Sequence, residues 1–199
     1  MSNNLTNSSR VKVKVKKGSK SISSRRWLER QLNDPYVIAA KEDGYRSRSA
    51  YKLIELNNKF KFLYKGKTVI DLGAAPGGWS QVAAKIIGLP KSGQLVSVDI
   101  QDIIPIVGVS FINGNIMDEK IIETIKNKLE GQTDVVMSDM APSASGHRNT
   151  DQTRALLLAE LALDTAVQLL QKDGSFCCKL IRGKGEEEFV DTMRKYFSS

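Results

Sequence analysis

A glycine-rich segment at residues 71–79 restricts the fold of this 199-residue chain more than any other feature. It reads Asp-Leu-Gly-Ala-Ala-Pro-Gly-Gly-Trp, between a β-branched run at residues 67–71 and apolar residues at helical spacing over 79–87. The pattern predicts a buried parallel strand, a turn almost without side chains, and a helix. Glycine lets a ligand approach the backbone, and the first helical turn offers unpaired N–H groups. A cofactor site is therefore expected, although glycine turns without a chemical role also join strands to helices.

An acidic residue strengthens the prediction of a nucleotide-like ligand. The second strand pattern, residues 94–99, ends in Asp99, which follows Gly77 by 22 residues. Carboxylates at about this interval, roughly 20 residues, bind ribose hydroxyls in βαβ nucleotide sites. Gly73 is followed by Ala-Ala-Pro before the next glycine pair, so the dinucleotide fingerprint G-x-G-x-x-G is absent. The loop therefore favours a ligand other than NAD.

Three charged residues are candidates for chemistry. Lys179 interrupts the apolar strand pattern of residues 175–181, where an unpaired ammonium is costly, so it is a functional candidate. Asp139 ends the strand pattern 134–139 at the edge where α/β proteins bind ligands, with a turn cap as the alternative role. Lys52 lies on the flank of an amphipathic helix, where lysines commonly meet solvent, and the pattern alone gives it no role.

Several ordered motifs resemble the FtsJ/RrmJ (RlmE-type) family of S-adenosylmethionine-dependent ribose 2′-O-methyltransferases. The similarity spans residues 25–197. The matching segments are residues 46–53, 71–81, 106–109, 136–146 and 174–179. The resemblance implies a Rossmann-like class I methyltransferase fold, which is an α/β fold with a mostly parallel central sheet and helices on both faces.

The same resemblance implies S-adenosylmethionine as the cofactor. The positions that match its site are Gly73, Gly77, Trp79, Asp99, Asn115 and Asp139. Asp99 matches the ribose ligand, Asp139 lies beside the sulfonium, and Gly77 and Trp79 belong to the methionine and adenosine side. Relatives commonly carry aspartate at position 115 to accept a hydrogen bond from the adenine amino group, which an Asn amide oxygen also accepts. The alternative that this Asn only ends a strand stays open.

The resemblance also assigns catalytic positions. Lys179 matches the family's catalytic base, and Lys52 matches a second active-site lysine. Methyl transfer to a hydroxyl requires an in-line approach and removal of the hydroxyl proton. Desolvation and repulsion by Lys52 would favour the neutral form of Lys179. Asp139 would oppose that effect, so its expected role is to orient Lys179 and to attract the cationic cofactor.

The chain departs from the family pattern at its C-terminus. Family members continue beyond the helix-like residues 186–197 into two more strands, which carry an active-site glutamate. The sequence is therefore expected to lack an edge hairpin of the sheet and a fourth active-site residue. Either the natural protein is longer than these 199 residues or this form is impaired.

Positive charge is concentrated at the N-terminus. Residues 1–26 contain eight of the 30 basic residues and no acidic residue, and the other 22 basic residues balance the 22 acidic ones. A flexible basic arm over residues 1–25 and a methyltransferase domain over residues 26–199 are therefore expected, with RNA as the partner. A solubilising leader, or a strand at residues 11–15, is the alternative. The family resemblance places Arg46, Arg48 and Arg148 near the RNA-facing opening, where they are expected to extend the basic surface.

Composition indicates one domain, because 199 residues with 41% apolar content can bury a sizeable core. Residues 155–170 form the longest apolar stretch, but they include two acidic residues and therefore predict a packed helix rather than a membrane span. This helix is expected to be capped near Thr150 or Asp151 and ended by Gly174. The two adjacent cysteines face opposite sides of a strand, so we expect no disulfide or metal site. A reducing cytoplasm is the expected location.

Together these features predict an enzyme that transfers a methyl group from S-adenosylmethionine to the ribose 2′-hydroxyl of a uridine in 23S ribosomal RNA, in the assembled large subunit. Ribosomal RNA is the expected partner, without a membrane or an obligate protein partner. Transfer RNA and messenger cap structures are alternative acceptors. A non-catalytic RNA-binding assembly factor is the competing class, but retention of Lys52, Asp139 and Lys179 argues against it. A Rossmann oxidoreductase is disfavoured by the form of the glycine loop.

Overall fold

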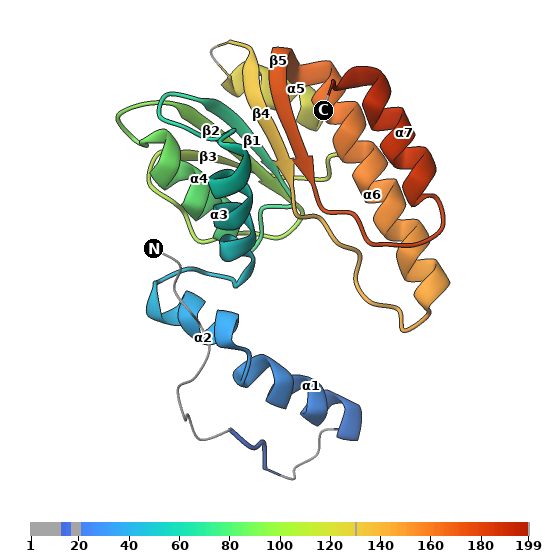
Figure 1. Ribbon diagram of the computed structural model, residues 1–199. Coiled ribbons are helices and arrows are strands. Elements are labelled where there is room, and N and C mark those ends of the chain that lie inside the picture. The colour runs from blue at the N-terminus through green and yellow to red at the C-terminus, as the bar shows by residue number, and fades with distance from the viewer. Residues whose placement is uncertain (1–12, 17–20, 130, 199) are drawn as a thin grey trace.

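The computed structural model describes residues 13–16, 21–129 and 131–198. Five strands form one sheet in the order β3-β2-β1-β4-β5, with helices on both faces (Figure 1). The strands are β1 (Thr68–Leu72), β2 (Gln94–Asp99), β3 (Val109–Asn113), β4 (Thr133–Ser138) and β5 (Leu170–Cys178). The helices are α1 (Ile22–Leu32), α2 (Pro35–Glu42), α3 (Ser49–Phe60), α4 (Gly78–Ile87), α5 (Glu119–Lys128), α6 (Arg148–Leu169) and α7 (Glu186–Tyr196). The predicted α/β fold is confirmed, and each strand pairing in the described chain is parallel.

Alternate residues of the central strand β1 face opposite layers, so four of its five residues, 69–72, are buried. Val69 packs in a core with Ala83 of α4, whereas Ile70 packs in a second core with Ala162 of α6. Helices α3 and α4 therefore cover one face, α5 and α6 cover the other, and α7 packs against α6 through Phe189. A parallel sheet covered on both faces keeps its carboxyl edge for a ligand.

The amino edge of the sheet is closed by Asp134. Its Oδ1 accepts hydrogen bonds from Lys67 Nζ and Gln171 Nε2, each 2.7 Å long. Its Oδ2 accepts the backbone N–H of Thr68, also at 2.7 Å. One carboxylate thus joins β1, β4 and β5, and it fixes the register of strands whose opposite ends carry the candidate site.

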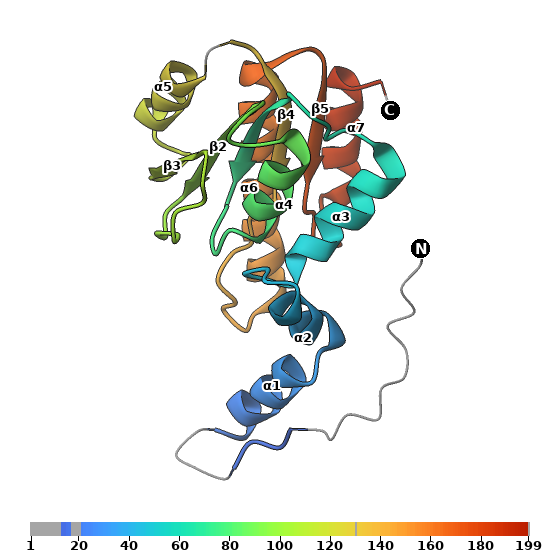
Figure 2. The ribbon, with the colours of Figure 1, turned by 90° about the vertical axis from the view of Figure 1, so that its left-hand side faces the viewer.

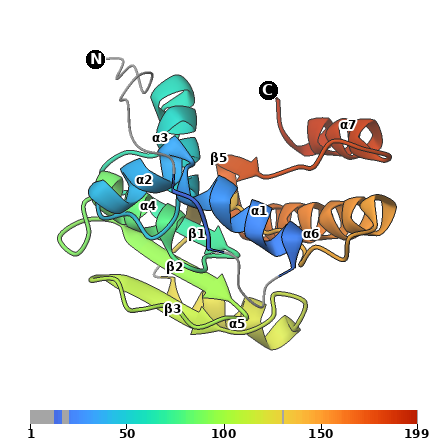
Figure 3. The same cartoon turned by 90° about the horizontal axis from the view of Figure 1, so that it is seen from below.

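Helices α1 and α2 project beyond the carboxyl edge of the sheet (Figures 1, 2 and 3). Helix α2 begins after Asp34, whose Oδ1 accepts the N–H groups of Tyr36 and Val37 as an N-cap. Because α1 already begins at Ile22, the predicted boundary between residues 25 and 26 lies inside this helix.

The alternative of a strand at residues 11–15 does not hold for its described part. Residues 13–16 form no strand, and their backbone instead bonds to side chains of α1 and its C-cap. Asn33 exchanges two hydrogen bonds with Val13, of 2.8 and 2.9 Å, and Glu29 accepts the N–H of Val15 at 3.1 Å. Residues 11 and 12 lie outside the described part of the chain. Helix side chains therefore take the place of a partner strand.

The predicted bounds of the long apolar helix are corrected at both ends. Helix α6 begins at Arg148, because the Asp151 carboxylate accepts the N–H and hydroxyl of Ser145 and so braces the preceding loop instead of capping a helix start. The helix ends at Leu169 rather than Gly174. Residues 170–178 instead pair with β4 as β5, and an irregularity between Thr133 and Val135 accommodates the change of register. Long-range pairing therefore overrides the local helix pattern.

The expectation that the two cysteines face opposite sides of a strand is confirmed, and the charge at the start of α7 suits its helix dipole. Three glutamates occupy the first turn of α7, where the helix dipole favours negative charge. Cys177 packs with the α3–α4 face of the sheet and Cys178 with the α6–α7 face, so the two thiols point apart. Burial raises the pKa of Cys177 to about 11 and that of Cys178 to about 12, so both thiols are protonated at neutral pH.

Candidate active site

A pocket of about 420 Å³ opens where the first four strands end. Four of the predicted cofactor residues line it, and each follows a different strand: Gly73 follows β1, Asp99 ends β2, Asn115 follows β3 and Asp139 follows β4. The other lining residues are Leu72, Ala75, Val98, Ile100, Gln101, Gly114, Ile116, Met117, Met140, Ala141, Pro142, Ser143 and Leu158. The topology therefore gathers residues that are up to 66 positions apart in the sequence.

Gly73 lets the ends of β1 and β4 approach each other. Its φ is +75°, and a Cβ at this position would collide with the side chain of Met140 and lie 3.0 Å from its Cα. The N–H of Gly73 donates a 2.9 Å hydrogen bond to the carbonyl of Val98 in β2. Glycine is required here by the packing of the strand ends, and the same packing forms the floor of the pocket.

Asp99 is held in place by two backbone donors. Its Oδ2 accepts the N–H of Ala75, and its Oδ1 accepts the N–H of Gln101, both at 2.8 Å. The carboxylate thereby ties the glycine loop to the end of β2. A carboxylate has about four lone-pair directions, so it keeps acceptor capacity for the hydroxyls of a ligand.

Asn115 lines the pocket and also stabilises a turn. It follows β3 by two residues, and its Oδ1 accepts the N–H of Met117 at 3.0 Å. An amide oxygen has a second lone pair and the amide nitrogen is a donor, so the group retains capacity for a base edge. Both sequence interpretations of Asn115, a turn residue and a cofactor ligand, are compatible with this geometry.

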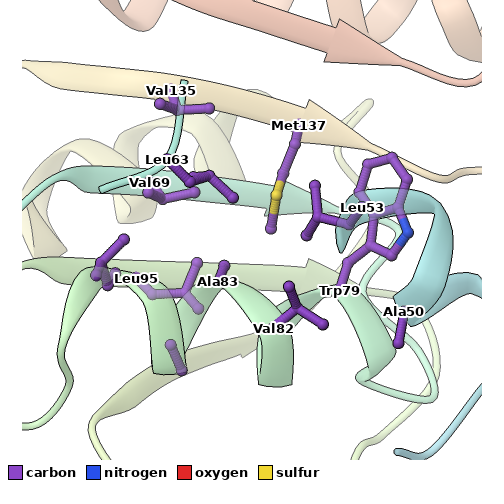
Figure 4. Close-up of a cluster of buried hydrophobic side chains, with 12 residues drawn as sticks. Ala50, Leu53, Leu63, Val69, Trp79, Val82, Ala83, Leu95, Val135 and Met137 are labelled. Atoms are coloured by element: carbon purple, nitrogen blue, oxygen red, sulfur yellow. The ribbon is translucent and has the colours of Figure 1, made fainter. Parts of the chain in front are cut away.

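Trp79 and Gly77 do not line the pocket. Trp79 is 4% exposed and packs against α3 in the core (Figure 4), and its indole N–H donates a 2.9 Å hydrogen bond to the carbonyl of Ser49. Gly77 precedes α4 with φ +110°, and a Cβ there would lie 2.7 Å from Nη1 of Arg46. Both residues therefore shape the start of α4 and contact the N-terminal part of the chain.

Lys179 and Asp139 form an ion pair at the carboxyl edge. Lys179 directly follows β5, and its N–H donates to the carbonyl of Ser138 at 2.8 Å. Its Nζ lies 3.0 Å from Oδ1 of Asp139 and donates a 2.7 Å hydrogen bond to the backbone carbonyl of Asp139. The Lys179 side chain is 26% exposed. Asp139 therefore stands between the pocket and a lysine that solvent or a substrate can reach.

Lys52 is not joined to this pair. It lies on α3 and is exposed, and no hydrogen bond or ion pair connects it with Lys179 or Asp139. The neighbouring Leu53 is fully buried, so the amphipathic pattern of this helix is confirmed. The expected repulsion between Lys52 and Lys179 stays a prediction.

Asp71 is a buried carboxyl that sequence reasoning left without a role. Its Oδ2 accepts a 2.6 Å hydrogen bond from Ser80, and the Ser80 and Ser97 hydroxyls lie 2.9 Å apart. Its Oδ1 is buried without a partner among the described residues. Burial raises the pKa of Asp71 to about 7. The hydrogen bond from Ser80 opposes this rise, and repulsion from Asp139 and Asp99 adds to it. Three carboxyls thus gather below and around the pocket.

Two of the three arginines expected to extend a basic surface are engaged within the chain. Arg46 donates to three backbone carbonyls beside the cofactor pocket. Arg48 forms an ion pair with Asp34 at the start of α2. Only Arg148, at the first position of α6, remains exposed without a hydrogen bond or ion pair to the described residues. Sequence spacing contained no signal for these partners, because they lie 14 to 59 positions away.

An all-parallel α/β sheet with a glycine-edged pocket at its carboxyl end defines the Rossmann-like class, which holds nucleoside-containing cofactors. The family model of the FtsJ-like methyltransferases matches residues 45–199. The chain therefore belongs to the FtsJ-like methyltransferase family, and S-adenosylmethionine is its methyl donor.

Among the described residues, no helix has both the length and the apolar character that a membrane span requires.

Known relatives agree with this assignment over most of the chain. A protein of Marinobacter nauticus named ribosomal RNA large subunit methyltransferase E is 48% identical over 180 residues, which cover 90% of this chain and 86% of the relative. A protein of the same name from Brucella ovis is 45% identical over 190 residues, covering 95% and 79%. The crystal structure of a protein from Plasmodium falciparum, titled as a ribosomal RNA methyltransferase, superposes with a TM-score of 0.67 at 29% identity, over 78% of this chain and 88% of that one.

The pocket fits the charge of this methyl donor. S-adenosylmethionine carries a sulfonium and an ammonium group, and the described pocket lining contains two carboxylates and no Lys or Arg. Oδ1 of Asp139 is buried and has the ion pair with Lys179 as its interaction within the described residues. Opposite charge in a partly desolvated pocket stabilises a cationic ligand more than a neutral one.

Proposed function

We propose that this enzyme methylates the ribose 2′-hydroxyl of a uridine in 23S ribosomal RNA, with the assembled large subunit as its substrate. The support is the ribosomal RNA large subunit methyltransferase E name of relatives that are 48% and 45% identical over nearly the whole chain. The observation that carries the chemistry is the ion pair of Lys179 with Asp139, whose carboxylate also lines the cofactor pocket. A bacterial ribosomal acceptor would place the reaction in the cytoplasm.

In this proposal the neutral amine of Lys179 would accept the proton of the attacking hydroxyl while the oxygen–methyl bond forms, and S-adenosylhomocysteine would leave as the methyl–sulfur bond breaks. The bound donor supplies the electrophilic methyl group. Asp139 holds Lys179 through both its carboxylate and its backbone carbonyl, so the direction of Nζ is fixed before the substrate arrives. Positioning of the hydroxyl is therefore the main contribution, with proton transfer following as the new C–O bond forms.

RNA would meet the chain on the side where α1 and residues 13–16 project (Figures 1 and 2). Val13 bonds to Asn33, and Val15 bonds to Glu29. These hydrogen bonds hold residues 13–16 against α1, and we call residues 13–16 the docked strap. Residues four apart on a helix are about 6 Å apart along its axis, close to the two-residue repeat of an extended chain, about 6.6 Å. Glu29, the one acidic residue of α1, is thereby engaged with the backbone.

We call the docked strap together with helix α1 the N-terminal module. With Glu29 engaged, the charged side chains that this module exposes are cationic. The exposed basic residues of the docked strap and α1 are Lys14, Lys16, Arg26 and Arg30. Clustered cations bind nucleic acid by neutralising phosphates and releasing counterions, without reading sequence. We therefore assign this module a role in RNA affinity and orientation, while the choice of nucleotide belongs to the carboxyl edge.

The test is transfer of labelled methyl from S-adenosylmethionine to large ribosomal subunits that lack ribose methylation, followed by mapping of the modified nucleotide. Lys179→Ala should abolish transfer and leave cofactor binding intact. Lys172→Ala is the matched control, because Lys172 lies exposed in the same strand β5, in its first half. Free 23S RNA, transfer RNA and capped RNA are tested in parallel. Transfer to transfer RNA or capped RNA alone would overturn the ribosomal acceptor, and binding without any transfer would favour an assembly factor.

A further inference from the structure

Arg46 joins two loops that border the cofactor pocket. Its Nη1 donates to the carbonyl oxygens of Ile104 at 2.5 Å and Pro76 at 3.4 Å, and its Nη2 donates to that of Pro105 at 3.1 Å. Pro76 belongs to the glycine loop after β1, and residues 104 and 105 belong to the loop between β2 and β3. The guanidinium of Arg46 therefore bridges two segments that are about 30 positions apart in the chain.

The backbone of Arg46 is anchored as firmly as its side chain. Its N–H donates to Oε1 of Gln81 at 2.8 Å, and Nε2 of Gln81 donates to the carbonyl of Gly44 at 3.1 Å. Gln81 lies in the first turns of α4, directly after the glycine loop. The backbone of Arg46 is therefore held by the start of α4, and its guanidinium is held by the glycine loop directly before α4.

Gly77 provides the space through which the Arg46 side chain passes. A Cβ on Gly77 would lie 2.7 Å from Nη1 and 3.1 Å from Cδ of Arg46, and 3.4 Å from Cδ1 of Ile106. A side chain at this position would therefore push the guanidinium away from the carbonyls that it bonds. The positive φ of Gly77 and the path of the Arg46 side chain therefore both favour glycine here, without any contact to the cofactor.

The β2–β3 loop, residues 100–108, has few other attachments at its middle. Ile104 is 76% exposed and Val107 is 78% exposed, and only Ile106 packs against a core cluster. Among the described residues, Arg46 provides the recorded hydrogen bonds to the carbonyls of Ile104 and Pro105. The loop begins with two residues that line the pocket, so its position affects the shape of the pocket.

We propose that Arg46 is a positioning residue for the methyl-donor site, which holds the β2–β3 loop against the glycine loop and so fixes the pocket wall formed by Ile100 and Gln101. A guanidinium suits this role because its planar fork donates to several carbonyls at once and stays charged at all physiological pH values. The proposal rests on the methyl-donor assignment of the pocket, and it needs no contact between Arg46 and the donor or the RNA.

The first test compares Arg46→Ala with Arg48→Ala. Arg48 is two residues away and pairs with Asp34, so its loss removes an equal charge without touching the loop. Without cofactor, hydrogen exchange of the amides of residues 101–109 should become faster in Arg46→Ala and stay unchanged in Arg48→Ala. Calorimetric titration with S-adenosylhomocysteine should give about tenfold weaker binding for Arg46→Ala, as expected for loss of charge-assisted hydrogen bonds in a partly exposed site.

The second test separates positioning from charge and from misfolding. Arg46→Lys keeps the charge but replaces the planar fork, whose two terminal nitrogens reach carbonyls of both loops, with a single ammonium nitrogen. Its loop exchange and its binding should therefore resemble those of Arg46→Ala. At saturating S-adenosylmethionine, kcat should stay within about threefold, while KM for the donor rises by about tenfold. Thermal melting of each variant checks the fold. Unchanged loop exchange and S-adenosylhomocysteine binding in a folded Arg46→Ala protein would overturn the proposal, whether or not RNA is the substrate.

Discussion

The cofactor pocket and the N-terminal module carry opposite charge. The described pocket lining holds Asp99 and Asp139 and no basic residue, whereas the docked strap and α1 expose four cations. The formal net charge of +8 therefore describes neither region. Salt screens exposed charges beyond about 8 Å at physiological ionic strength, so the attraction of the exposed cations for a polyanion depends on salt. A cationic methyl donor and a polyanionic acceptor can thus bind neighbouring parts of one chain.

The two regions also differ in how their charges are held. Asp99 is fixed by two backbone N–H groups and Asp139 by an ion pair with Lys179, while the cations of the N-terminal module lie on exposed side chains. Groups in fixed geometry contribute to catalysis by orienting the reacting atoms. Exposed cations contribute to RNA affinity by the number of phosphates that they neutralise. Single changes should therefore be severe in the pocket and mild on the module.

The largest effect is expected for Asp139→Asn. This change removes the charge that both lines the pocket and holds Lys179, so kcat for methyl transfer should fall by about 10²–10⁴. Single-turnover transfer to undermethylated large subunits measures it, and titration with S-adenosylhomocysteine shows the loss of donor affinity separately. Asp164→Asn, on the exposed side of α6, is the control. Activity within about threefold of the wild type would remove Asp139 from the proposed mechanism.

A pH-dependent effect on stability is expected from Asp71. Its pKa is raised from 3.8 to about 7, so the unfolded chain ionises first as the pH rises through this range. The native state therefore loses stability between about pH 4 and 7, by up to about 4 kcal/mol. Asp71→Asn removes this titration, so wild type and variant should diverge as the pH rises, in favour of the variant. Urea unfolding at several pH values measures it, and parallel curves would contradict the buried, unpaired carboxyl.

A smaller effect is expected when the exposed cations of the N-terminal module are changed to Gln. Removal of four phosphate contacts should make the slope of log K against log salt shallower by up to about 3, since single strands give about 0.7 per contact. RNA binding titrations between low and high salt measure this slope. The charge-matched control changes Lys65, Lys85, Lys91 and Lys172, which lie toward the other end of the sheet. An equal change of slope in the control would show that the module has no special role.

The smallest effect is expected for Asn33→Ala, which keeps all the cations but removes the side chain that docks the strap. The amides of Val13 and Val15 should exchange faster, by an amount equivalent to about 1 kcal/mol for the lost hydrogen bonds. RNA affinity should fall by about two- to threefold, with an unchanged salt slope. Gln31→Ala on the same helix serves as the control. Slow exchange retained in Asn33→Ala would mean that other contacts hold residues 13–16.

Much of the fold and part of the site were predictable from local patterns. Short β-branched runs predicted β1, β2 and β4, and Asp99, Asp139 and Lys179 were identified because each ends or interrupts an apolar strand. The start of β5 was not predictable in this way. Leu170 continues the apolar helix pattern of α6, and only its pairing with Thr133 makes it the first residue of a strand.

The sequence by itself determined the order of the elements, the placement of carboxylates at strand ends and the excess of positive charge near the N-terminus. Each of these depends on neighbouring residues along the chain. Tertiary structure decided which charges remain available. Arg46 and Arg48 read as surface cations, yet both have partners that are remote in sequence, and Asp71 becomes a buried acid only when β1 lies between β2 and β4. Hydrogen-bond partners and desolvation depend on distance in space, which sequence spacing does not contain.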